Sequence, residues 1–327
     1  MRKLRFVLLI VLALFFIVSC AGQGVSDCAG GLCVATWNVQ NLFDANLDGN
    51  EYEEYRPSSG WTQSAYESRL SNARKVLQSL PQSESYIIVL NEIEGPNVVE
   101  DLIKNGDIAK MGLRYYACAG MEGGAIQTAV ISSLPIAAAK VHDVGEGQRP
   151  ILEAEFDTSS GKIFVLALHL KSNIGTSSET AAKRREAALT VKDVSDQILS
   201  DNPGSVVLVC GDMNEECWDN NVFGKGDDAV LKAKGEFGRD FWYCLWMDTD
   251  LNLWPGGSYM YNGLWKCYDN ILLSASAKDQ TGWEYESCGL VFENIQKTAD
   301  SKPFAWDRDL LRGVSDHLPL WVRLNSF

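Results

Sequence analysis

The sequence predicts an α/β fold in one large domain, and three observations lead to this prediction. Short apolar runs rich in β-branched and aromatic residues recur along the chain and end in polar residues, as buried strands do. Two longer stretches have the periodicity of amphipathic helices and fall between pairs of these runs. Some neighbouring runs are joined by a tight turn and others by a helix, so we expect mixed sheets and not a purely parallel sheet.

The chain begins with a predicted secretory signal, residues 1–19. Basic residues precede an unbroken apolar run, Phe6 to Val18, which is shorter than the roughly 20 residues that a membrane-spanning helix needs. The run leads into Ile-Val-Ser-Cys at 17–20, which resembles the lipobox of bacterial lipoproteins. We therefore expect Cys20 to carry lipid and to become the mature N-terminus. The alternative is ordinary cleavage that leaves Cys20 as a free thiol.

The expected location is outside the cytoplasm, anchored by lipid to a bacterial membrane. Ala21 follows Cys20 where an aspartate could stand, which by resemblance to lipoproteins of diderm bacteria favours the outer membrane or the cell surface. Removing the signal takes away three positive charges, so the net charge changes from −14 to about −17. A chain this acidic must hold a phosphate-containing substrate by local cations or bound metal, because it has no general basic surface.

Residues 20–32 are small and polar and predict a short tether, and residues 33–327 predict the folded domain. Eight cysteines follow Cys20, and an even number in an exported chain permits disulfides without assigning them. The cysteines form no C-x-x-C pair, which argues against a zinc site. We expect the domain to act as a monomer.

The expected elements of the domain follow from these patterns in chain order. Two of the strands flank a Ser-Ser-Gly turn and predict a β-hairpin. The expected strands are Cys33–Trp37, Tyr86–Leu90, Gln127–Ser132, Ile151–Phe156, Ile163–Leu170, Val206–Cys210, Asp269–Leu273 and Leu318–Leu324, and the expected helices are Ser64–Leu80 and Ser178–Leu199.

Polar residues close most of the expected strands, and they share one chemistry. They are carboxylates, amides and histidines without thiolates, which is what a hard cation such as Mg²⁺ and a phosphoryl group require. Each residue alone is weak evidence, because a Gly-Asp-x-Asn sequence is more often a turn and a lone histidine is more often satisfied by the backbone. In chain order they are Asn38, Glu92, His169, Asp212, Asn214, Asp269, Asp316 and His317.

In this order the segments resemble the endonuclease/exonuclease/phosphatase superfamily. That superfamily includes pancreatic deoxyribonuclease, exonuclease III-type repair nucleases, neutral sphingomyelinases and inositol polyphosphate phosphatases. The most specific motifs are G-D-M-N at 211–214 and S-D-H-L-P at 315–319, and the resemblance extends from Val34 to Leu324. It implies an α/β fold of four layers, an α/β/β/α sandwich with two mixed β-sheets and a site at the strand ends along one edge.

The resemblance also implies a metal site and a site for the attacking water. Asn38, Glu92 and Asp316 correspond to the metal-binding set, which would take Mg²⁺ or Mn²⁺. Asp212 and Asn214 would orient the attacking water or a second metal. A structural Ca²⁺ ion is a further expectation.

Two histidines complete the implied machinery. His317 resembles the essential histidine of the family, held by Asp269, while Asp316 would turn the other way toward the metal because adjacent residues on a strand point to opposite sides. A carboxylate that fixes the imidazole tautomer raises its basicity, so His317 could activate water or stabilise charge on the phosphorane. His169 would face the leaving oxygen. Its expected acidic partner is not evident, because Gln127 stands where a glutamate could.

Three residues would contact the phosphate by the same resemblance. Lys171 and Asn173, just beyond His169, would supply a cation and an amide to its oxygens. Arg149 would be a second cation, with a surface arginine as the alternative. The third histidine, His142, lies in a polar segment that we interpret as a surface turn.

The substrate is the least determined part of the prediction. The segment G-G-S-Y-M-Y-N-G-L-W contains Tyr259, Tyr261 and Trp265 and resembles a pattern of exported bacterial members that are described as nucleases. Such rings stack on bases, although they are also ordinary core residues. The leading hypothesis is therefore a Mg²⁺-dependent nuclease, with nucleic acid as its partner.

Two rival hypotheses remain. One is a phosphodiesterase or phosphatase acting on phospholipid, as a sphingomyelinase does, or on inositol phosphates. A sphingomyelinase-like enzyme would be expected to have an exposed aromatic hairpin, and residues 241–247 are the candidate, although Cys244 suggests a disulfide-tethered core segment instead. The other is a non-catalytic adhesin or toxin-like module on the same scaffold, against which the intact set of polar residues argues.

Overall fold

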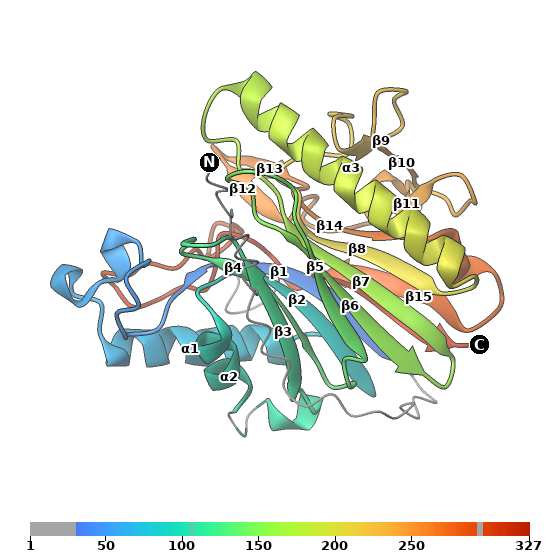
Figure 1. Ribbon diagram of the computed structural model, residues 1–327. Helices are drawn as coiled ribbons and strands as arrows, with labels where there is room; N and C mark the ends of the chain where they lie inside the picture. Colours follow the sequence, from blue (N-terminus) through green and yellow to red (C-terminus); the bar gives the residue numbers. More distant parts are fainter. Residues whose placement is uncertain (1–30, 105, 107, 293–296) are drawn as a thin grey trace, which may run out of the picture.

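Two large β-sheets packed face to face form the centre of the molecule, with helices on their outer faces (Figure 1). The structure is a computed structural model, and it describes residues 31–104, 106, 108–292 and 297–327. The predicted signal and most of the predicted tether, with Cys20 and Cys28, lie outside the described residues. The four-layer α/β/β/α sandwich with two mixed sheets is confirmed.

The first sheet has six strands in the order β15-β16-β1-β2-β4-β3. Its central pair, β1 and β2, is parallel, and the other neighbours are antiparallel. Its strands are β1 (Leu32–Leu42), β2 (Ser85–Ile93), β3 (Tyr115–Gly120), β4 (Gln127–Ser132), β15 (Trp283–Leu290) and β16 (Leu320–Ser326).

The second sheet has eight strands in the order β5-β6-β7-β8-β14-β11-β10-β9, and a separate two-stranded hairpin is formed by β12 and β13. The parallel pair β7 and β8 lies near the middle of the larger sheet. The strands are β5 (Ala138–His142), β6 (Ile151–Thr158), β7 (Gly161–His169), β8 (Val206–Asp212), β9 (Phe223–Gly224), β10 (Leu231–Lys234), β11 (Trp242–Cys244), β12 (Tyr259–Tyr261), β13 (Leu264–Lys266) and β14 (Asp269–Leu273).

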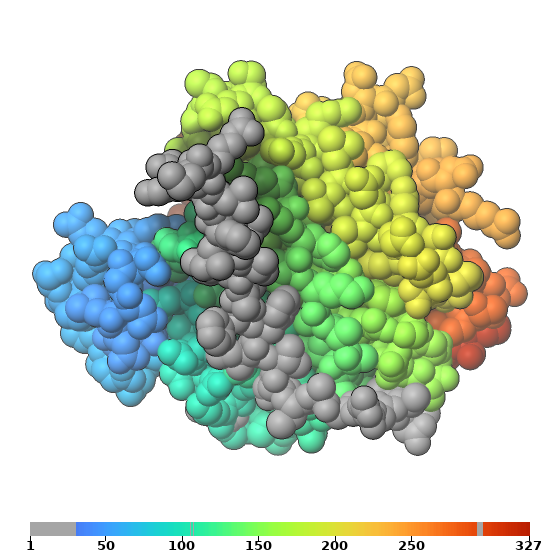
Figure 2. Space-filling model, viewed as in Figure 1, coloured from blue at the N-terminus to red at the C-terminus, as the bar shows by residue number. Residues whose placement is uncertain are grey.

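Helices cover the outer faces of the sheets. The first sheet carries α1 (Gln63–Gln78) and α2 (Pro96–Ile103), and the second carries α3 (Ser177–Asp201), whose outer side is exposed in Figure 2. The Thr62 side chain caps α1 by accepting a hydrogen bond from Ala65 N. Short 3-10 turns occupy Glu53–Tyr55, Pro57–Ser59, Ala109–Met111, Leu245–Met247 and Ala275–Lys278.

Alternation along the strands builds three apolar cores. On β1, Leu32 and Val34 face the core between the sheets, whereas Cys33 and Ala35 face the core beneath α1 and α2. On β8, the even-numbered apolar residues 206–210 enter the core between the sheets, and Val207 packs beneath α3. Continuous apolar runs therefore mark strands that are covered on both faces.

Most expected strands are present with shifted ends. Gln127–Ser132 and Asp269–Leu273 are found with the expected bounds, and the final strand begins at Leu320. The prediction missed α2 and eight strands, namely β3, β5, β9 to β13 and β15. Of these, β3, β5 and β15 lie at sheet edges and are only partly buried, so they lack the continuous apolar runs that identify central strands. The strands β9 to β13 are only two to four residues long, which is too short for a periodic pattern.

Two expectations about single residues are wrong. Cys244 is a free, buried thiol in β11, and each of the seven cysteines in the described ranges is free. His142 ends β5 and is not in a surface turn; its Nε2 lies 2.7 Å from the buried carboxylate of Glu153. Among the described residues, no helix is long and apolar enough to cross a membrane.

Candidate active site

Polar strand ends from both sheets meet at one edge of the sandwich. Asn38 on β1 pairs in register with Asn91 on β2. In the other sheet, Asp212 at the end of β8 pairs with His169 on β7 and with Asp269 on β14. Asn38 Nδ2 donates to Asp212 Oδ2 at 3.0 Å, and this bond joins the two sheets at the site.

Three residues at this edge, Gly211, Asn214 and Glu92, have positive backbone φ angles. Gly211 has a φ of +146°, and a Cβ there would lie 1.9 Å from Leu168 O, so the G-D-M-N motif requires its glycine. Asn214 has a φ of +50°. Glu92 has a φ of +66° where the register between β2 and β4 shifts, and such a conformation costs a non-glycine residue about 1–3 kcal/mol.

A bonded group of amides and carboxylates forms the floor of the site. Asn38 Nδ2 also donates to Glu92 Oε1 at 2.9 Å, so it bridges Glu92 and Asp212. Asp212 Oδ1 accepts a hydrogen bond from Asn214 N at 2.9 Å. Asp212 N donates to Asn91 Oδ1 at 2.9 Å. Each of these side chains therefore has a fixed orientation.

Burial makes the charged forms of Asp212 and Glu92 less favourable than they are in water. Burial raises the pKa of Asp212 to about 6, although the nearby His317 opposes the rise. Burial also raises the pKa of Glu92, and the like charge of Asp316 adds to the effect while the Asn38 amide opposes it. A divalent cation would relieve this unfavourable burial of negative charge, and the donors are oxygen atoms, so the residues fit a hard metal ion.

The Asp269–His317 pair has the expected geometry. His317 Nδ1 lies 2.7 Å from Asp269 Oδ2, and both side chains are buried. His317 Nε2 lies 3.9 Å from Asp212 Oδ2. Burial disfavours the charged imidazolium, but Asp269 outweighs it, with help from Asp212 and Asp316, and raises the pKa of His317 to about 10.

His169 reaches the same carboxylates but lacks a comparable partner. Its Nε2 lies 3.7 Å from Asp212 Oδ2 and 3.9 Å from Glu92 Oε1. Its Nδ1 is buried and has no hydrogen-bond partner in the part of the chain that the structure describes. Burial, followed by the charges of Arg149 and His317, holds the pKa of His169 well below its usual value.

Asp316 and His317 precede the final strand, so the expected alternation on a strand does not orient them. The His317 amide donates to Ser315 Oγ at 3.0 Å, and the Asp316 amide donates to Gln40 Oε1 at 3.1 Å. Asp316 is half-buried, and its charge raises the pKa of both His317 and Glu92. Asp316 and His317 are therefore positioned by hydrogen bonds of a loop, and not by the alternation of side chains along a strand.

The structure brings two of the three expected phosphate contacts into the site. Arg149 Nη1 donates to His169 O at 3.2 Å. Asn173 Nδ2 donates to Asn214 O at 2.9 Å. Lys171 Nζ instead contacts its own loop, at 3.4 Å from Ile174 O.

Several residues that hold the site were missed by the sequence prediction. Asn91 is fully buried and links the sheets, since its Nδ2 also donates to Leu168 O at 2.9 Å. An amide inside an apolar strand run was the available signal. Gln40 accepts from the Asp316 segment, and buried Arg69 on α1 donates to the carbonyls of Val39 and Val314. No local pattern marks those two residues.

Among the described residues, carboxylates also gather in one further place. Of the described His, Cys, Asp and Glu side chains, those of Asp212, Asp269 and His317 form one group with ligand atoms within 4.8 Å. Those of Asp48, Glu51 and Glu94, near the ends of β1 and β2, form the other.

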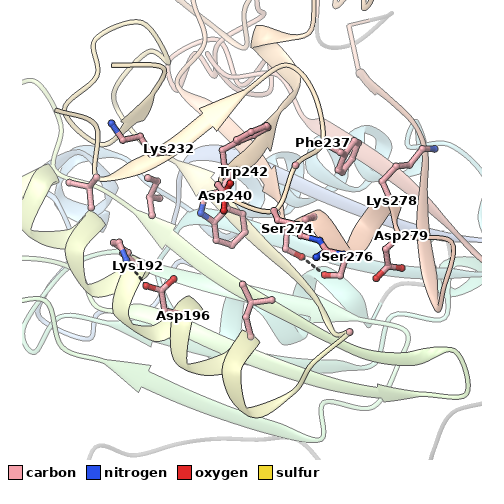
Figure 3. Close-up of a pocket in the computed structure, with 18 residues that line it drawn as sticks. Lys192, Asp196, Lys232, Phe237, Asp240, Trp242, Ser274, Ser276, Lys278 and Asp279 are labelled. Carbon is pink, nitrogen blue, oxygen red and sulfur yellow. Dashed lines mark hydrogen bonds and ion pairs between the residues drawn. The ribbon is translucent and has the colours of Figure 1, made fainter. Parts of the chain in front are cut away.

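A cavity of about 940 Å³ lies between α3 and the segments around β10 and β11 (Figure 3). Its lining includes Ser274, which follows β14, whereas Asp269 begins that strand. A five-residue strand is about 16 Å long, so the cavity is at the far end of the sheet from the polar group.

Comparisons with known proteins agree on one family. A family model described as "Endonuclease/Exonuclease/phosphatase family" matches residues 33–326. Comparison with curated proteins gave no match.

Three solved structures share the fold at low identity. A humanized TDP2 from D. rerio is 17% identical, with a TM-score of 0.55 over 90% of this chain and 99% of that one. Sphingomyelinase C from Streptomyces griseocarneus is 13% identical, with a TM-score of 0.54 over 90% and 99%. An endonuclease/exonuclease/phosphatase from Bacteroides vulgatus is 13% identical, with a TM-score of 0.53 over 91% and 99%.

Proposed function

This chain belongs to the endonuclease/exonuclease/phosphatase family, and on that basis we propose that it is a Mg²⁺- or Mn²⁺-dependent nuclease that cuts phosphodiester bonds outside the cytoplasm. As a member of the family it is a phosphoric ester hydrolase. The observation that carries the proposal is the buried Asp269–His317 pair facing Asp212, because phosphoryl transfer needs charge stabilisation at a fixed position.

In this proposal the two acids near His317, Asp269 and Asp212, have different roles. Asp269 fixes the orientation of the His317 ring by bonding Nδ1, so Nε2 faces the phosphate and stabilises the charge that develops there. Asp212, with a pKa raised to about 6 by burial, is suited to accept a proton from the attacking water. Asn214 orients that water with it.

His169 faces the leaving oxygen in the same scheme. Its low pKa keeps the imidazole neutral, and its Nε2 lies within 4 Å of the carboxylates of Glu92 and Asp212. Arg149 and Asn173 contact the phosphate oxygens, and Lys171 would join them by turning away from its loop carbonyl.

Asn38, Glu92 and Asp316 would hold the metal ion. When bound, the ion supplies a Lewis acid that neutralises charge on the phosphate. The raised pKa of Glu92 and the oxygen-only donor set support this assignment. The proposal covers this active-site cation, and we assign no ligands to the expected structural Ca²⁺ ion.

Nucleic acid is the favoured substrate class, and phospholipid is the second candidate. The aromatic segment from Tyr259 to Trp265 supports nucleic acid. A related D. rerio TDP2 has been solved with a single-strand DNA product. The lipid alternative is supported by the likeness to a sphingomyelinase. It is also supported by an exposed hairpin, although this is not the expected segment 241–247, in which Tyr243 and Cys244 are buried. The exposed hairpin is β12–β13, which carries Leu264.

One assay tests the reaction and the substrate together. Purified mature protein with Mg²⁺ is given plasmid DNA, RNA, sphingomyelin and inositol phosphates in parallel. We expect cleavage of nucleic acid, and the inactive control is His317→Ala. Turnover of sphingomyelin or inositol phosphate without cleavage of DNA or RNA would refute the nuclease proposal.

The location of the protein is a separate proposal. We propose that Cys20 carries lipid at the mature N-terminus and that this lipid anchors the protein, as a monomer, to a bacterial membrane. The outer membrane or the cell surface is the favoured location. The lipobox-like sequence supports it. Mass spectrometry of membrane-extracted protein should find a lipid-modified Cys20, and Cys20→Ser should release the protein with its turnover unchanged. A retained Met1 or an unmodified Cys20 would contradict the proposal.

A further inference from the structure

The hairpin β12–β13 has a defined shape beside the site. Its turn residues Asn262 and Gly263 have φ values of +50° and +78°, which is the combination that a two-residue type I′ turn needs. Tyr261 pairs with Leu264 across the hairpin. Because side chains alternate along a strand, Tyr259 and Tyr261 lie on the same face.

The opposite face of the hairpin is already occupied. Met260 pairs with Trp265, and the Trp265 ring packs edge-on against Phe292 with centroids 5.5 Å apart. The tyrosine face is therefore the one turned toward the site.

Backbone and side-chain contacts attach the hairpin and its tyrosine face to Asp269 and His317. Ser258 O accepts a hydrogen bond from Leu318 N at 2.7 Å, and Ser258 Oγ accepts one from Asp269 N at 3.1 Å. Tyr259 pairs with His317 through the backbone, and their rings stack with centroids 4.4 Å apart at 23°. The position of the hairpin relative to His317 is thus fixed.

Three tyrosine rings continue from the imidazole in nearly parallel planes. The Tyr259 ring is inclined by 20° to Tyr261 and by 21° to Tyr268, with centroid distances of 6.5 and 5.6 Å. Tyr268 Oη accepts a hydrogen bond from Asn173 Nδ2 at 3.2 Å, which connects the rings to the proposed phosphate contacts. Tyr261 is 56% exposed and ends the row in solvent. We call Tyr259, Tyr261 and Tyr268 the tyrosine row.

We infer that the tyrosine row is a stacking subsite for an unpaired nucleobase next to the scissile phosphate, so that the enzyme takes single-stranded nucleic acid. This inference rests on the proposed nuclease function and names its substrate class. A base in a duplex has both faces covered by its neighbours, whereas an unpaired base offers a free face to a tyrosine ring. Stacking tolerates any base, because each has a π face.

The observations favour a base over an acyl chain for two reasons. The rings of the tyrosine row lie nearly parallel to one another, beginning at the His317 imidazole, and such an alignment suits a planar base. A flexible acyl chain would not need the rings to be aligned. In addition, the net charge of −14 deprives a nucleic acid of general attraction, so stacking must supply affinity near the cleaved bond. Exposed Leu264 and Trp254 make lipid the alternative to be tested.

The test uses single-stranded DNA dodecamers with Mg²⁺, each carrying one abasic tetrahydrofuran residue at a successive position. For wild type, KM should rise about 5- to 150-fold when the abasic residue occupies the stacking position. Tyr261→Leu should remove most of this difference between intact and abasic strands, because it keeps bulk but loses the ring. Tyr261→Phe should retain the difference, and so should Leu264→Thr, the control on the facing strand.

The outcomes separate this inference from the function on which it rests. If Tyr261→Leu cleaves nucleic acid with the same intact-to-abasic ratio as wild type, the stacking subsite is wrong and the nuclease proposal stands. If wild type cleaves no nucleic acid but hydrolyses sphingomyelin in vesicles, both fall. Equal KM values for duplex and single-stranded DNA in wild type would also overturn the preference for unpaired bases.

Discussion

Two histidines approach the same carboxylate oxygen, yet their surroundings favour opposite charge states. Nε2 of His317 lies 3.9 Å from Asp212 Oδ2, and Nε2 of His169 lies 3.7 Å from it. Both imidazoles are buried, which disfavours charge. Asp269 at Nδ1 raises the pKa of His317 to about 10, whereas burial lowers the pKa of His169. The presence of a carboxylate at Nδ1 of His317, and the lack of one at Nδ1 of His169 among the described residues, therefore decide the charge of each ring.

This difference suits the two rings to different work on one phosphate. A cationic His317 can stabilise negative charge, and a neutral His169 can hydrogen-bond the leaving oxygen without adding a second positive charge beside it. Pairs of groups whose pKa values are pushed apart are typical of acid–base sites.

The largest effect should follow loss of the charged ring. His317→Ala should lower kcat by about 10²- to 10⁴-fold, because a positioned charge and proton carrier is removed. Asp269→Asn should cost about as much or less. The double variant should be little worse than His317→Ala, since the two residues act as one unit. Steady-state kinetics on folded protein measure all three.

Thermal unfolding of the same variants is the control. If Asp316 and His317 merely cap the start of the final strand, substitution should lower the melting temperature and leave turnover per folded molecule unchanged. Near-wild-type turnover by folded His317→Ala would remove the catalytic assignment.

The next effect concerns the cation and distinguishes Asp316 from its neighbour His317. EDTA should abolish turnover, and Mg²⁺ or Mn²⁺ should restore it. Asp316→Asn and Glu92→Gln should raise the metal concentration for half-maximal rate by about tenfold or more, because each loses a charged oxygen donor. Mg²⁺ titrations measure this. Full activity in chelator would contradict the metal assignment.

A smaller effect should appear in the pH dependence of unfolding free energy, measured by urea denaturation in EDTA. The folded pKa of His317 is raised, so its stabilisation is complete below about pH 6.5 and is lost as pH rises toward 10. The folded pKa of His169 is lowered, so stability is lost as pH falls below about 6.5, where the unfolded chain binds a proton.

Two substitutions separate these slopes. Asp269→Asn should flatten the alkaline slope, and His169→Gln should flatten the acid slope. Identical slopes in both variants and in wild type would mean that the two histidines do not differ in charge as their surroundings indicate.

The sequence predicted the parts of this site that local pattern encodes. Asn38, Glu92, Asp212 and Asp269 each follow or begin an apolar run, so their place at a sheet edge was readable. The sandwich itself came from the family resemblance, because periodicity does not specify which sheets pack together.

The rest could not be predicted because it depends on contacts between distant segments. Asn91 joins two sheets, and Arg69 holds carbonyls 30 and 245 residues away in the chain. The orientation of Asp316 follows from Gln40, which lies 276 residues earlier. No alternation rule along one strand contains that information.

The smallest effect on catalysis concerns Gln127, which stands where an acidic partner of His169 was expected. The side chain lines a cavity of about 120 Å³ together with Asp44, Asp48 and Glu94, and burial raises the pKa of Glu94 to about 8. Gln127→Glu should therefore add a like charge beside Glu94 and lower the melting temperature, more at pH 9 than at pH 6. Turnover per folded molecule should stay within about twofold of wild type.

The acid slope that His169 produces should also be unchanged in Gln127→Glu, because the new carboxylate would belong to the Glu94 group. Gln127→Met is the matched control, since it removes the amide without adding charge. If Gln127→Glu instead flattens the acid slope, as a carboxylate at His169 Nδ1 would, then this position can supply the missing partner. The contrast between the two histidines would then rest on one substitution in β4, and not on the separate surroundings of the two strands that carry His169 and Asp269.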